Sequence, residues 1–500
     1  MKPQKPEEIT PHLRRALPRA AIAVRQGSAV EEAGVTYAIA TADDEDLLAI
    51  LGPEGAARGF EAAHASRTGG ISVSLCRLSH ANAQALRRAL PFTSPRPLGG
   101  MDATVGLGDR LGLAGPGHIA AIRRYVAWPV LAQQSVRELT LTGRTFADVL
   151  DAATWAVMSG GYREPWGADG DHLKTEEQVR TALSAGFTMI TADVSDALHR
   201  EVASRSDAEV LAMYRGLDPK YRAEVEHRYL ASPIPLVSGA AVRFTDTELR
   251  RIVMLYRDSV ELAGRLYRAA VATRGEDGFD FELSIDETDT PTTPQAHVFM
   301  GLESRRMGIA LASLAPRFVG EFQKAIDYIG AIKEFDRCYA EHVEIASTLG
   351  YRISVHSGSD KFSVFPAIGR LARGRFHIKT AGTSWLEALR VVAAQDPALF
   401  RDLYAVALQR YGHARALYHV TPDLGAIPIA AEVTPRNAPD LLDDVNARRV
   451  LHITYGEILA VPALKDRFFR LMRWNEEEYA RVLDAHIGRH LELLGIQLRG

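Results

Sequence analysis

The sequence predicts an α/β protein whose main domain is a (β/α)8 barrel. Between about residue 101 and residue 395, short apolar segments alternate with amphipathic helical patterns, which is typical of a parallel sheet. An open doubly wound sheet also fits, because closure cannot be read from sequence. The expected strands are Ala103–Leu107, Val130–Gln133, Tyr162–Ala168, Phe187–Ala192, Phe279–Ile285, Gly308–Leu314, Tyr351–His356 and Arg375–Thr380.

Helical patterns follow several of these strands, most clearly at Thr145–Met158, Thr175–Ser184 and Glu321–Leu349. The changes of pattern along the chain divide it into parts. We expect an N-terminal α+β extension, a barrel, a helical insertion after the fourth strand, and a helical C-terminal region. Their expected ranges are residues 1–97, 98–395, 197–275 and 396–500.

Composition narrows the class of protein. Hydrophobic residues make up 47% and charged residues 24%, as in ordinary globular proteins, and the net charge of −3 gives no reason to expect nucleic acid or an anionic membrane as partner. Cys76 and Cys338 are the two cysteines, which excludes a disulfide framework or a zinc ribbon. The N-terminus lacks the apolar core of a signal peptide, and no apolar run approaches the ~18 residues of a membrane span. A cytoplasmic enzyme is therefore expected.

Polar side chains directly follow three of the expected strands. They occur in Trp166–Lys174, Phe281–Thr290 and Tyr351–Phe362, where each apolar or small-residue run breaks into carboxylates, hydroxyls, histidine or lysine. Because the carboxyl ends of barrel strands meet at one face, these side chains should share one site.

The histidines at these strand ends are candidate metal ligands. His172 lies among acidic residues, and His356 is the last residue of its strand. Neutral imidazole is a common ligand for zinc, nickel and manganese ions, so the pair predicts a metal site. His297 lies ten residues beyond Glu287 and could join it. The alternative for each is a hydrogen-bonded structural histidine.

Asp286 and Glu287 are candidate acids or bases, and Asp286 is also expected to bind substrate. Alternation along the strand puts Asp286 on the same face as Glu282 and Glu287 on the opposite face, unless the strand has already ended. A carboxylate beside a metal can ligate it or transfer a proton. The alternative is a helix cap or a solvated loop acid.

Cations and hydroxyls near strand ends are suited to a hydroxylated ligand that carries a carboxylate. The alternative for each cation is an ordinary surface charge. The candidates are the cations Arg110, Lys174, Arg317 and Lys361, the hydroxyl of Ser357, and the carboxylate of Asp360 in the same segment.

A glycine-rich segment, Gly106–Gly112, suggests a dinucleotide loop but departs from the GxGxxG spacing. The acidic residue that would bind the ribose about 20 residues later is missing, since Ala127–Leu131 stands there. We therefore expect no nicotinamide cofactor.

Several segments in order along the chain resemble the tagaturonate epimerase family. The resemblance runs from about residue 100 to the C-terminal helices and is less distinct before residue 95. The segments are Met101–Ala114, Ala132–Glu138, Gly167–Thr175, Ser284–Thr293, Leu314–Lys324 and Val355–Phe362.

The resemblance implies a (β/α)8 enzyme of hexuronate breakdown that interconverts D-tagaturonate and D-fructuronate with a divalent metal, such as zinc, manganese, nickel or cobalt. It places a catalytic base at Asp171 beside the metal ligand His172, a proton donor at Glu287, and a second metal ligand at His356. His297 is a further expected ligand. Gln134 is expected to bind substrate, and the enzyme could be a homo-oligomer.

Chemistry limits how such an epimerase can work. The inverted carbon lies one bond beyond the carbon next to the ketone, so its C–H is not acidified by the carbonyl. Without a nicotinamide site, retro-aldol cleavage and re-addition is the expected route. Asp171 would take the hydroxyl proton and Glu287 would return it, and the insertion at 197–275 could close the site.

Three other readings stay open. An epimerase of the neutral ketohexoses tagatose and fructose would share the chemistry. A metal-dependent sugar-acid aldolase would release both fragments. A non-catalytic sugar-binding barrel is the third.

Overall fold

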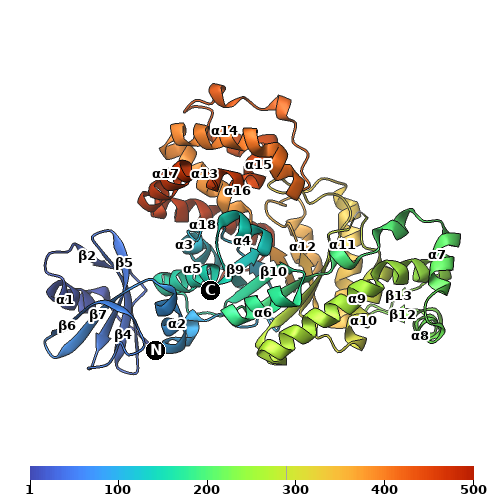
Figure 1. Ribbon diagram of the computed structural model, residues 1–500, viewed down its shortest axis with the longest axis horizontal. Helices are drawn as coiled ribbons and strands as arrows, with labels where there is room; N and C mark the ends of the chain where they lie inside the picture. Colours follow the sequence, from blue (N-terminus) through green and yellow to red (C-terminus); the bar gives the residue numbers. More distant parts are fainter. Residues whose placement is uncertain (289, 500) are drawn as a thin grey trace.

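The computed structural model describes residues 1–288 and 290–499 and contains a closed eight-stranded parallel barrel, so the predicted fold class is confirmed (Figure 1). Each strand pairs with the next one, and the last pairs with the first through His377 and Thr104. The barrel strands are β8 Thr104–Gly106, β9 Trp128–Ser135, β10 Gly167–Leu173, β11 Met189–Asp193, β14 Asp280–Ile285, β15 Ser313–Pro316, β16 Arg352–Val355 and β17 Phe376–Lys379. Each of the eight expected ranges overlaps a barrel strand, but the third and sixth were placed too early, since β10 begins at Gly167 and not at Tyr162, and β15 begins at Ser313 and not at Gly308.

The helices outside the barrel begin where the sequence supplies capping residues. Ser135, Thr145, Thr175 and Thr245 each accept a backbone N–H three residues on, and the acidic or amide side chain there reaches back. The helices are α3 Gly115–Ile122, α4 Val136–Thr142, α5 Phe146–Gly160, α6 Glu176–Ala185, α9 Asp246–Arg274, α10 Pro294–Arg306, α11 Ile332–Leu349 and α12 Phe365–Leu371.

The inside of the barrel is polar, whereas bulky aliphatic side chains fill most barrels of this kind. In β14, Phe281 and Leu283 face outward into the apolar layer under the helices, while Glu282 and Ser284 alternate to the inside. β10 likewise turns Asp169 and Asp171 inward. The expected third strand ended at Ala168, five residues before β10 ends. The polar residues after Ala168 continue the strand, because the carboxylates of Asp169 and Asp171 form ion pairs with Lys379 inside the barrel.

The N-terminal extension is a separate antiparallel sheet with a helix on each face (Figure 1). α1 Pro6–Ala16 packs on one face, and α2 His80–Ala89 together with α5 of the barrel packs on the other. Alternating apolar residues of β4 and β5 supply both layers. The strands are β1 Lys2–Pro3, β2 Ile22–Val24, β3 Val30–Glu32, β4 Val35–Ala42, β5 Glu45–Gly52, β6 Ala62–Thr68 and β7 Ile71–Arg77.

The segment between β11 and β14 carries the expected helices. α7 Asp207–Arg215, α8 Pro219–Leu230 and the ribbon of β12 Ile234–Pro235 and β13 Ala241–Val242 extend from the barrel (Figure 1). The long α9 packs against α6 and α10, so it serves as the barrel helix between these strands rather than as part of an added lobe. Residues before α9 form the true excursion.

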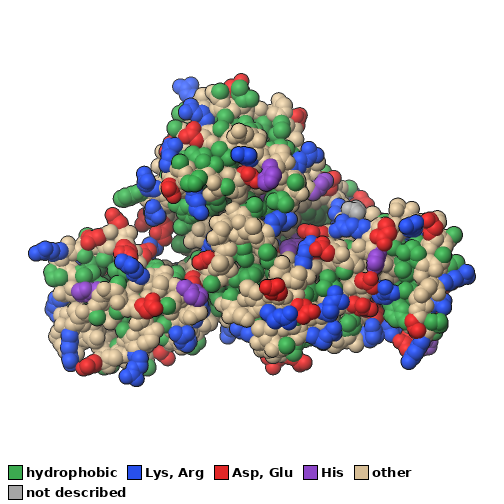
Figure 2. Space-filling model, in the orientation of Figure 1, with side chains coloured by type: hydrophobic (Ala, Val, Ile, Leu, Met, Phe, Trp, Pro, Cys, Tyr) green, Lys and Arg blue, Asp and Glu red, His purple; other side chains and the backbone are tan. Residues whose placement is uncertain are grey.

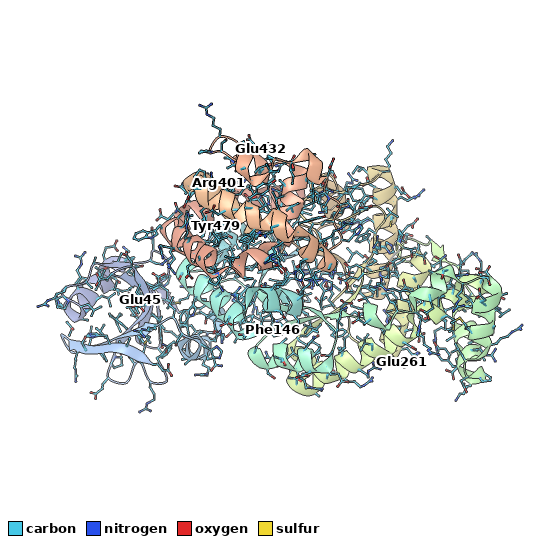
Figure 3. The ribbon with its side chains drawn as sticks, turned by 45° about the horizontal axis from the view of Figure 1, so that its top comes forward. Glu45, Phe146, Glu261, Arg401, Glu432 and Tyr479 are labelled. Carbon is cyan, nitrogen blue, oxygen red and sulfur yellow. The ribbon has the colours of Figure 1, made fainter. Side chains whose placement is uncertain are left out.

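The C-terminal helices form a second layer over the barrel, with an apolar core of their own. α18 returns to pack against α3 of the barrel, and its Tyr479, labelled in Figure 3, donates a hydrogen bond to the Ser384 carbonyl. No helix in the described chain is long and apolar enough to span a bilayer. The helices of this layer are α13 Thr383–Gln395, α14 Pro397–Ala414, α15 Val445–Ile453, α16 Tyr455–Leu459, α17 Pro462–Trp474 and α18 Glu476–Leu493.

We predict that Gly369→Ala destabilises the protein by about 1–3 kcal/mol, because an added methyl group would overlap the Leu494 carbonyl at the end of α18. Urea unfolding measures the change. Gly412→Ala is the matched control, since its Cβ meets nothing in α14 and a helical alanine should be neutral or stabilising by up to about 1 kcal/mol. Equal stability of the two variants would contradict the close contact between α12 and α18.

Candidate active site

A cavity of about 830 Å³ lies over the carboxyl ends of the barrel strands. Residues that follow β8, β9, β10, β14, β15, β16 and β17 line it, together with parts of the C-terminal helical layer. This is the face of a (β/α)8 barrel where strand-end side chains converge. The cavity is therefore the candidate active site.

Lys379, at the end of β17, occupies the centre of the barrel below this cavity. Its Nζ lies 2.8 Å from Asp169, 2.6 Å from Asp171 and 2.9 Å from Glu282, and it also donates to Thr191. Its side chain is only 4% exposed. One buried cation therefore balances three carboxylates from β10 and β14.

This arrangement separates the pKa values of the carboxyl groups. Burial raises the pKa of Asp169 to about 6, and the neighbouring acids add to this effect. Burial also favours the neutral form of Asp171, but Lys379, His172 and His356 outweigh it and hold the pKa of Asp171 well below its usual range. Asp171 is consequently ionised at neutral pH and available to accept a proton.

His172, His356 and Asp286 bring their ligand atoms within 4.8 Å of one another. The two imidazole rings lie edge to face, with centroids 4.9 Å apart. His356 Nε2 lies 2.7 Å from Glu282 and Nδ1 lies 3.3 Å from Asp286. The strand ends thus form a compact cluster of two imidazoles and a carboxylate, as predicted for His172 and His356 on one side of the site.

The chemistry of this cluster fits a divalent cation. The Nδ1 atoms of both histidines are buried and make no hydrogen bond to a described residue. The Glu282 carboxylate on the far nitrogen of His356 is the kind of partner that orients a metal-bound imidazole. Burial alone would lower the pKa of His172, but Asp171, Asp193 and Asp286 raise it to about 10, so the carboxylates around it attract positive charge. Two imidazoles and a carboxylate suit zinc, manganese, cobalt or nickel.

The backbone at the cluster is held in an unusual conformation. His172 and Ser357 have φ values of +51° and +50°, in the left-handed region that non-glycine residues rarely occupy. Such conformations persist where the surrounding structure fixes them, and they are enriched at functional sites.

Glu287 lines the cavity from beyond the end of β14 and is solvent exposed. Its carboxylate lies within the group formed with His172 and Asp193. The strand ends at Ile285, so strict alternation no longer applies and both Asp286 and Glu287 reach the cavity. Arg200 of the 3-10 turn Arg200–Ser204 donates to the Glu287 carbonyl at 2.6 Å.

Three further expected substrate-binding residues line the cavity. Arg110 is buried and donates to Glu138 at 2.8 Å. Arg317 donates to the Thr288 carbonyl, and the Ser357 hydroxyl accepts a hydrogen bond from Lys324 at 2.9 Å. Of these, Arg110 already has a carboxylate partner within the protein.

His297 lies away from the cavity. It is fully buried on α10, and its Nδ1 lies 2.8 Å from Nδ1 of His342. Burial lowers the pKa of His297 well below its ordinary value, and the ring also packs near Tyr351. The structure places it in the apolar layer between helices, as a structural histidine and not as a third ligand beside His172 and His356.

Four other expected substrate-binding residues do not line the cavity either. Gln134 alternates to the outside of β9, whereas its neighbour Gln133 lines the cavity. Lys174 lies 2.7 Å from the surface carboxylate Asp196. Lys361 Nζ is buried and donates to three backbone carbonyls, so it holds its loop together.

Asp360 belongs to a second cluster with His486 and His490, between the β16–α12 loop and α18. His490 Nε2 accepts a hydrogen bond from the backbone N–H of Asp360 at 3.1 Å. Arg448 lies 3.1 Å from Oδ2 of the Asp360 carboxylate. These contacts already engage the groups that would bind a cation. The cluster therefore ties the strand-end loop to the C-terminal layer.

Sequence analysis assigned no site role to Glu282, Asp193 or Gln133, and it did not predict that Lys379 would pair with buried acids. Each of the four occupies an inward position in a barrel strand. Their signal in the sequence is a polar residue at every second position of a short strand, which is visible only when the strand register is known.

The cavity is covered mainly by the C-terminal layer. Residues 415–421, which begin with the turn η5 Arg415–Leu417, and His452 of α15 line it. Within the expected insertion at 197–275, only Arg200 lines the cavity among the described residues. The expected helix Glu321–Leu349 begins only at Ile332, and the loop before it also forms part of the wall.

We predict that Lys379→Met destabilises the protein by about 3–5 kcal/mol at pH 7.5, because three buried carboxylates lose their cation. Repulsion and burial would then raise their pKa above the unfolded values, so part of the loss should be recovered at pH 5.5, where protonation is favoured in the folded state. Urea unfolding at both pH values measures this. Lys174→Met, at a partly exposed pair, should cost at most about 1 kcal/mol. An equal loss of unfolding free energy for Lys379→Met at both pH values would contradict the inference that Lys379 compensates the charge of these carboxylates.

Comparison with known proteins agrees with this geometry. A family model described as tagaturonate epimerase matches residues 26–494. A tagaturonate/fructuronate epimerase of Thermotoga maritima is 39% identical over 455 residues, which are 91% of this chain and 93% of that protein. Crystal structures of the fructuronate-tagaturonate epimerase of Cohnella laeviribosi, native and with glycerol, match with a TM-score of 0.91 and 42% identity, over 98% of this chain and 100% of theirs. The predicted resemblance is confirmed, and the chain belongs to the tagaturonate epimerase family.

Proposed function

We propose that the protein interconverts D-tagaturonate and D-fructuronate, as the names of its relatives indicate for those proteins. The observation that carries the proposal is the convergence of Asp171, His172, His356 and Asp286 at one end of a cavity that also holds cations. This arrangement offers a base, a candidate cation site and positive charge for a sugar acid. The retro-aldol route proposed below would use all three.

The reaction must invert a carbon whose C–H is not acidified by the ketone. Cleavage of the bond between that carbon and the carbon next to the ketone avoids this problem. Removal of the hydroxyl proton turns the inverting carbon into an aldehyde, and the bonding electrons pass to the ketone fragment as an enediolate. Rotation of the aldehyde and re-formation of the bond give the other epimer, with no atoms gained or lost.

Asp171 is the proposed base, because it lines the cavity floor and stays ionised at neutral pH. Lys379 is a positioning residue that holds its carboxylate in place through a 2.6 Å contact. Glu287, which is solvent exposed and lies with His172 and Asp193 at the cavity wall, is the proposed proton donor on re-formation of the hydroxyl.

His172, His356 and Asp286 would hold a divalent cation, with Glu282 orienting His356. A cation bound there would supply Lewis acidity, which polarises a ketone and lowers the pKa of a hydroxyl that it binds. The protein's own part is to orient the imidazoles, to keep Asp171 ionised and to exclude bulk water beneath residues 415–421.

We predict that the purified protein converts D-fructuronate to D-tagaturonate, that a chelator stops the conversion, and that an added divalent metal restores it. A carbon-13 NMR time course measures all three. Stoichiometric release of dihydroxyacetone would favour an aldolase instead. Conversion that is insensitive to chelation would exclude the metal at the His172–His356 cluster.

We predict that Asp171→Asn lowers kcat by at least about 100-fold, because the amide cannot accept the hydroxyl proton. Metal content, measured by elemental analysis, should stay near that of the wild type, since Asp171 is not in the ligand cluster. Asp402→Asn makes the same change at a partly exposed ion pair with Arg467 outside the cavity and should keep its activity. A nearly fully active Asp171→Asn variant would exclude the proposed base.

A further inference from the structure

The cavity holds more positive charge on one side than its carboxylates balance. Arg110, Arg137 and Lys324 all line it near Glu138. Glu138 is engaged by Arg110 through a buried contact of 2.8 Å. Among the described residues, neither Arg137 nor Lys324 forms an ion pair with a carboxylate. Two cations are therefore left over.

Of these two cations, Lys324 gives the clearer indication of a bound anion. Its Nζ donates to the Ser357 hydroxyl at 2.9 Å, and Ser357 follows the cluster residue His356 directly. Burial lowers the pKa of Lys324, and the like charge of Arg137 lowers it further. Holding two cations near each other in a cavity is unfavourable unless an anion joins them.

Arg137 is held ready in the first turn of α4. Its guanidinium donates to the Leu417 carbonyl at 3.1 Å and lies 4.6 Å from the centre of the Tyr418 ring. Its Nε is buried without a hydrogen-bond partner among the described residues. A planar guanidinium fixed in this way has a donor left for an oxygen anion.

We propose that Lys324 and Arg137 bind the carboxylate of the sugar acid and thereby select uronates over neutral ketohexoses. The proposal rests on the proposed function and adds the part of the site that sets its substrate class. The carboxylate would sit beside Ser357, one residue from the His356 cluster, so the ketone end of the same molecule can reach that cluster. Arg110, one of several cations that sequence analysis offered for this role, is already neutralised by Glu138.

Binding of the carboxylate by Lys324 and Arg137 also suits the cleavage step of the proposed reaction. After cleavage, the fragment that carries the carboxylate has its aldehyde two carbons away. If its carboxylate stays bound to Lys324 and Arg137, the aldehyde can turn about the adjoining carbon–carbon bond and present its other face. Carboxylate binding would then both retain the fragment and permit the rotation that inversion requires.

Calorimetric titration of the metal-loaded protein with D-fructuronate and with D-fructose tests the proposal, because a hydroxymethyl group replaces the carboxylate in the neutral sugar. Lys324→Met should weaken D-fructuronate binding by about 10- to 100-fold, the value of a hydrogen bond to a charged group. Binding of D-fructose should change far less. Lys324→Arg should keep most of the affinity for D-fructuronate, and Lys333→Met, on the exposed surface of α11, should leave it unchanged.

Urea unfolding separates this role from a structural one. Removal of an unpaired cation should leave the stability of Lys324→Met equal to or above that of the wild type, since repulsion from Arg137 is relieved. Unchanged D-fructuronate affinity in Lys324→Met, or an equal loss for both sugars, would overturn the carboxylate site. If the wild type bound D-fructuronate more tightly than D-fructose but did not convert it, the proposed function would fail while the carboxylate site would stand.

Discussion

The balance between Lys379 and the carboxylates of Asp169, Asp171 and Glu282 is the interaction on which the candidate site depends. Three acids inside a barrel would repel one another and protonate without a buried cation. Lys379 reaches all three because its strand, β17, closes the barrel against β8, so the cation stands across from β10 and β14. Closure of the barrel therefore brings Lys379 to Asp171, and this contact helps to keep Asp171 ionised.

The C-terminal helical layer has an equally direct effect on the site. It supplies residues 415–421 and His452 to the cavity wall, and Leu417 and Tyr418 hold Arg137 in place. The Asp360–His486 contact of 3.0 Å ties the loop after β16 to α18. On the face drawn in Figure 2, Lys, Arg, Asp and Glu side chains are interspersed over this layer, the barrel and the N-terminal sheet.

Much of the fold could be predicted from sequence, because the barrel strands are short apolar or small-residue segments separated by helical patterns. The weakest prediction was the end of β10, since Asp169 and Asp171 in a strand look like a loop until a partner is known. At the site, the strand-end positions of Asp171, His172 and His356 predicted that these side chains would share one place, and all three line the same cavity. The sequence could not place His297, because the direction of a histidine twelve residues past the end of β14 is set only when α10 packs.

The sequence by itself determined the strands, the family resemblance and the polar residues at the carboxyl ends of β10, β14 and β16, because these follow from local pattern and order. Tertiary structure alone decided which neighbour faces inward, Gln133 or Gln134, and which cation finds an acid. Among the described residues, Lys361 donates to three backbone carbonyls and Arg110 pairs with Glu138, whereas Lys324 and Arg137 form no ion pair with a carboxylate. Pairing of charges depends on segments hundreds of residues apart, and no local pattern records that distance.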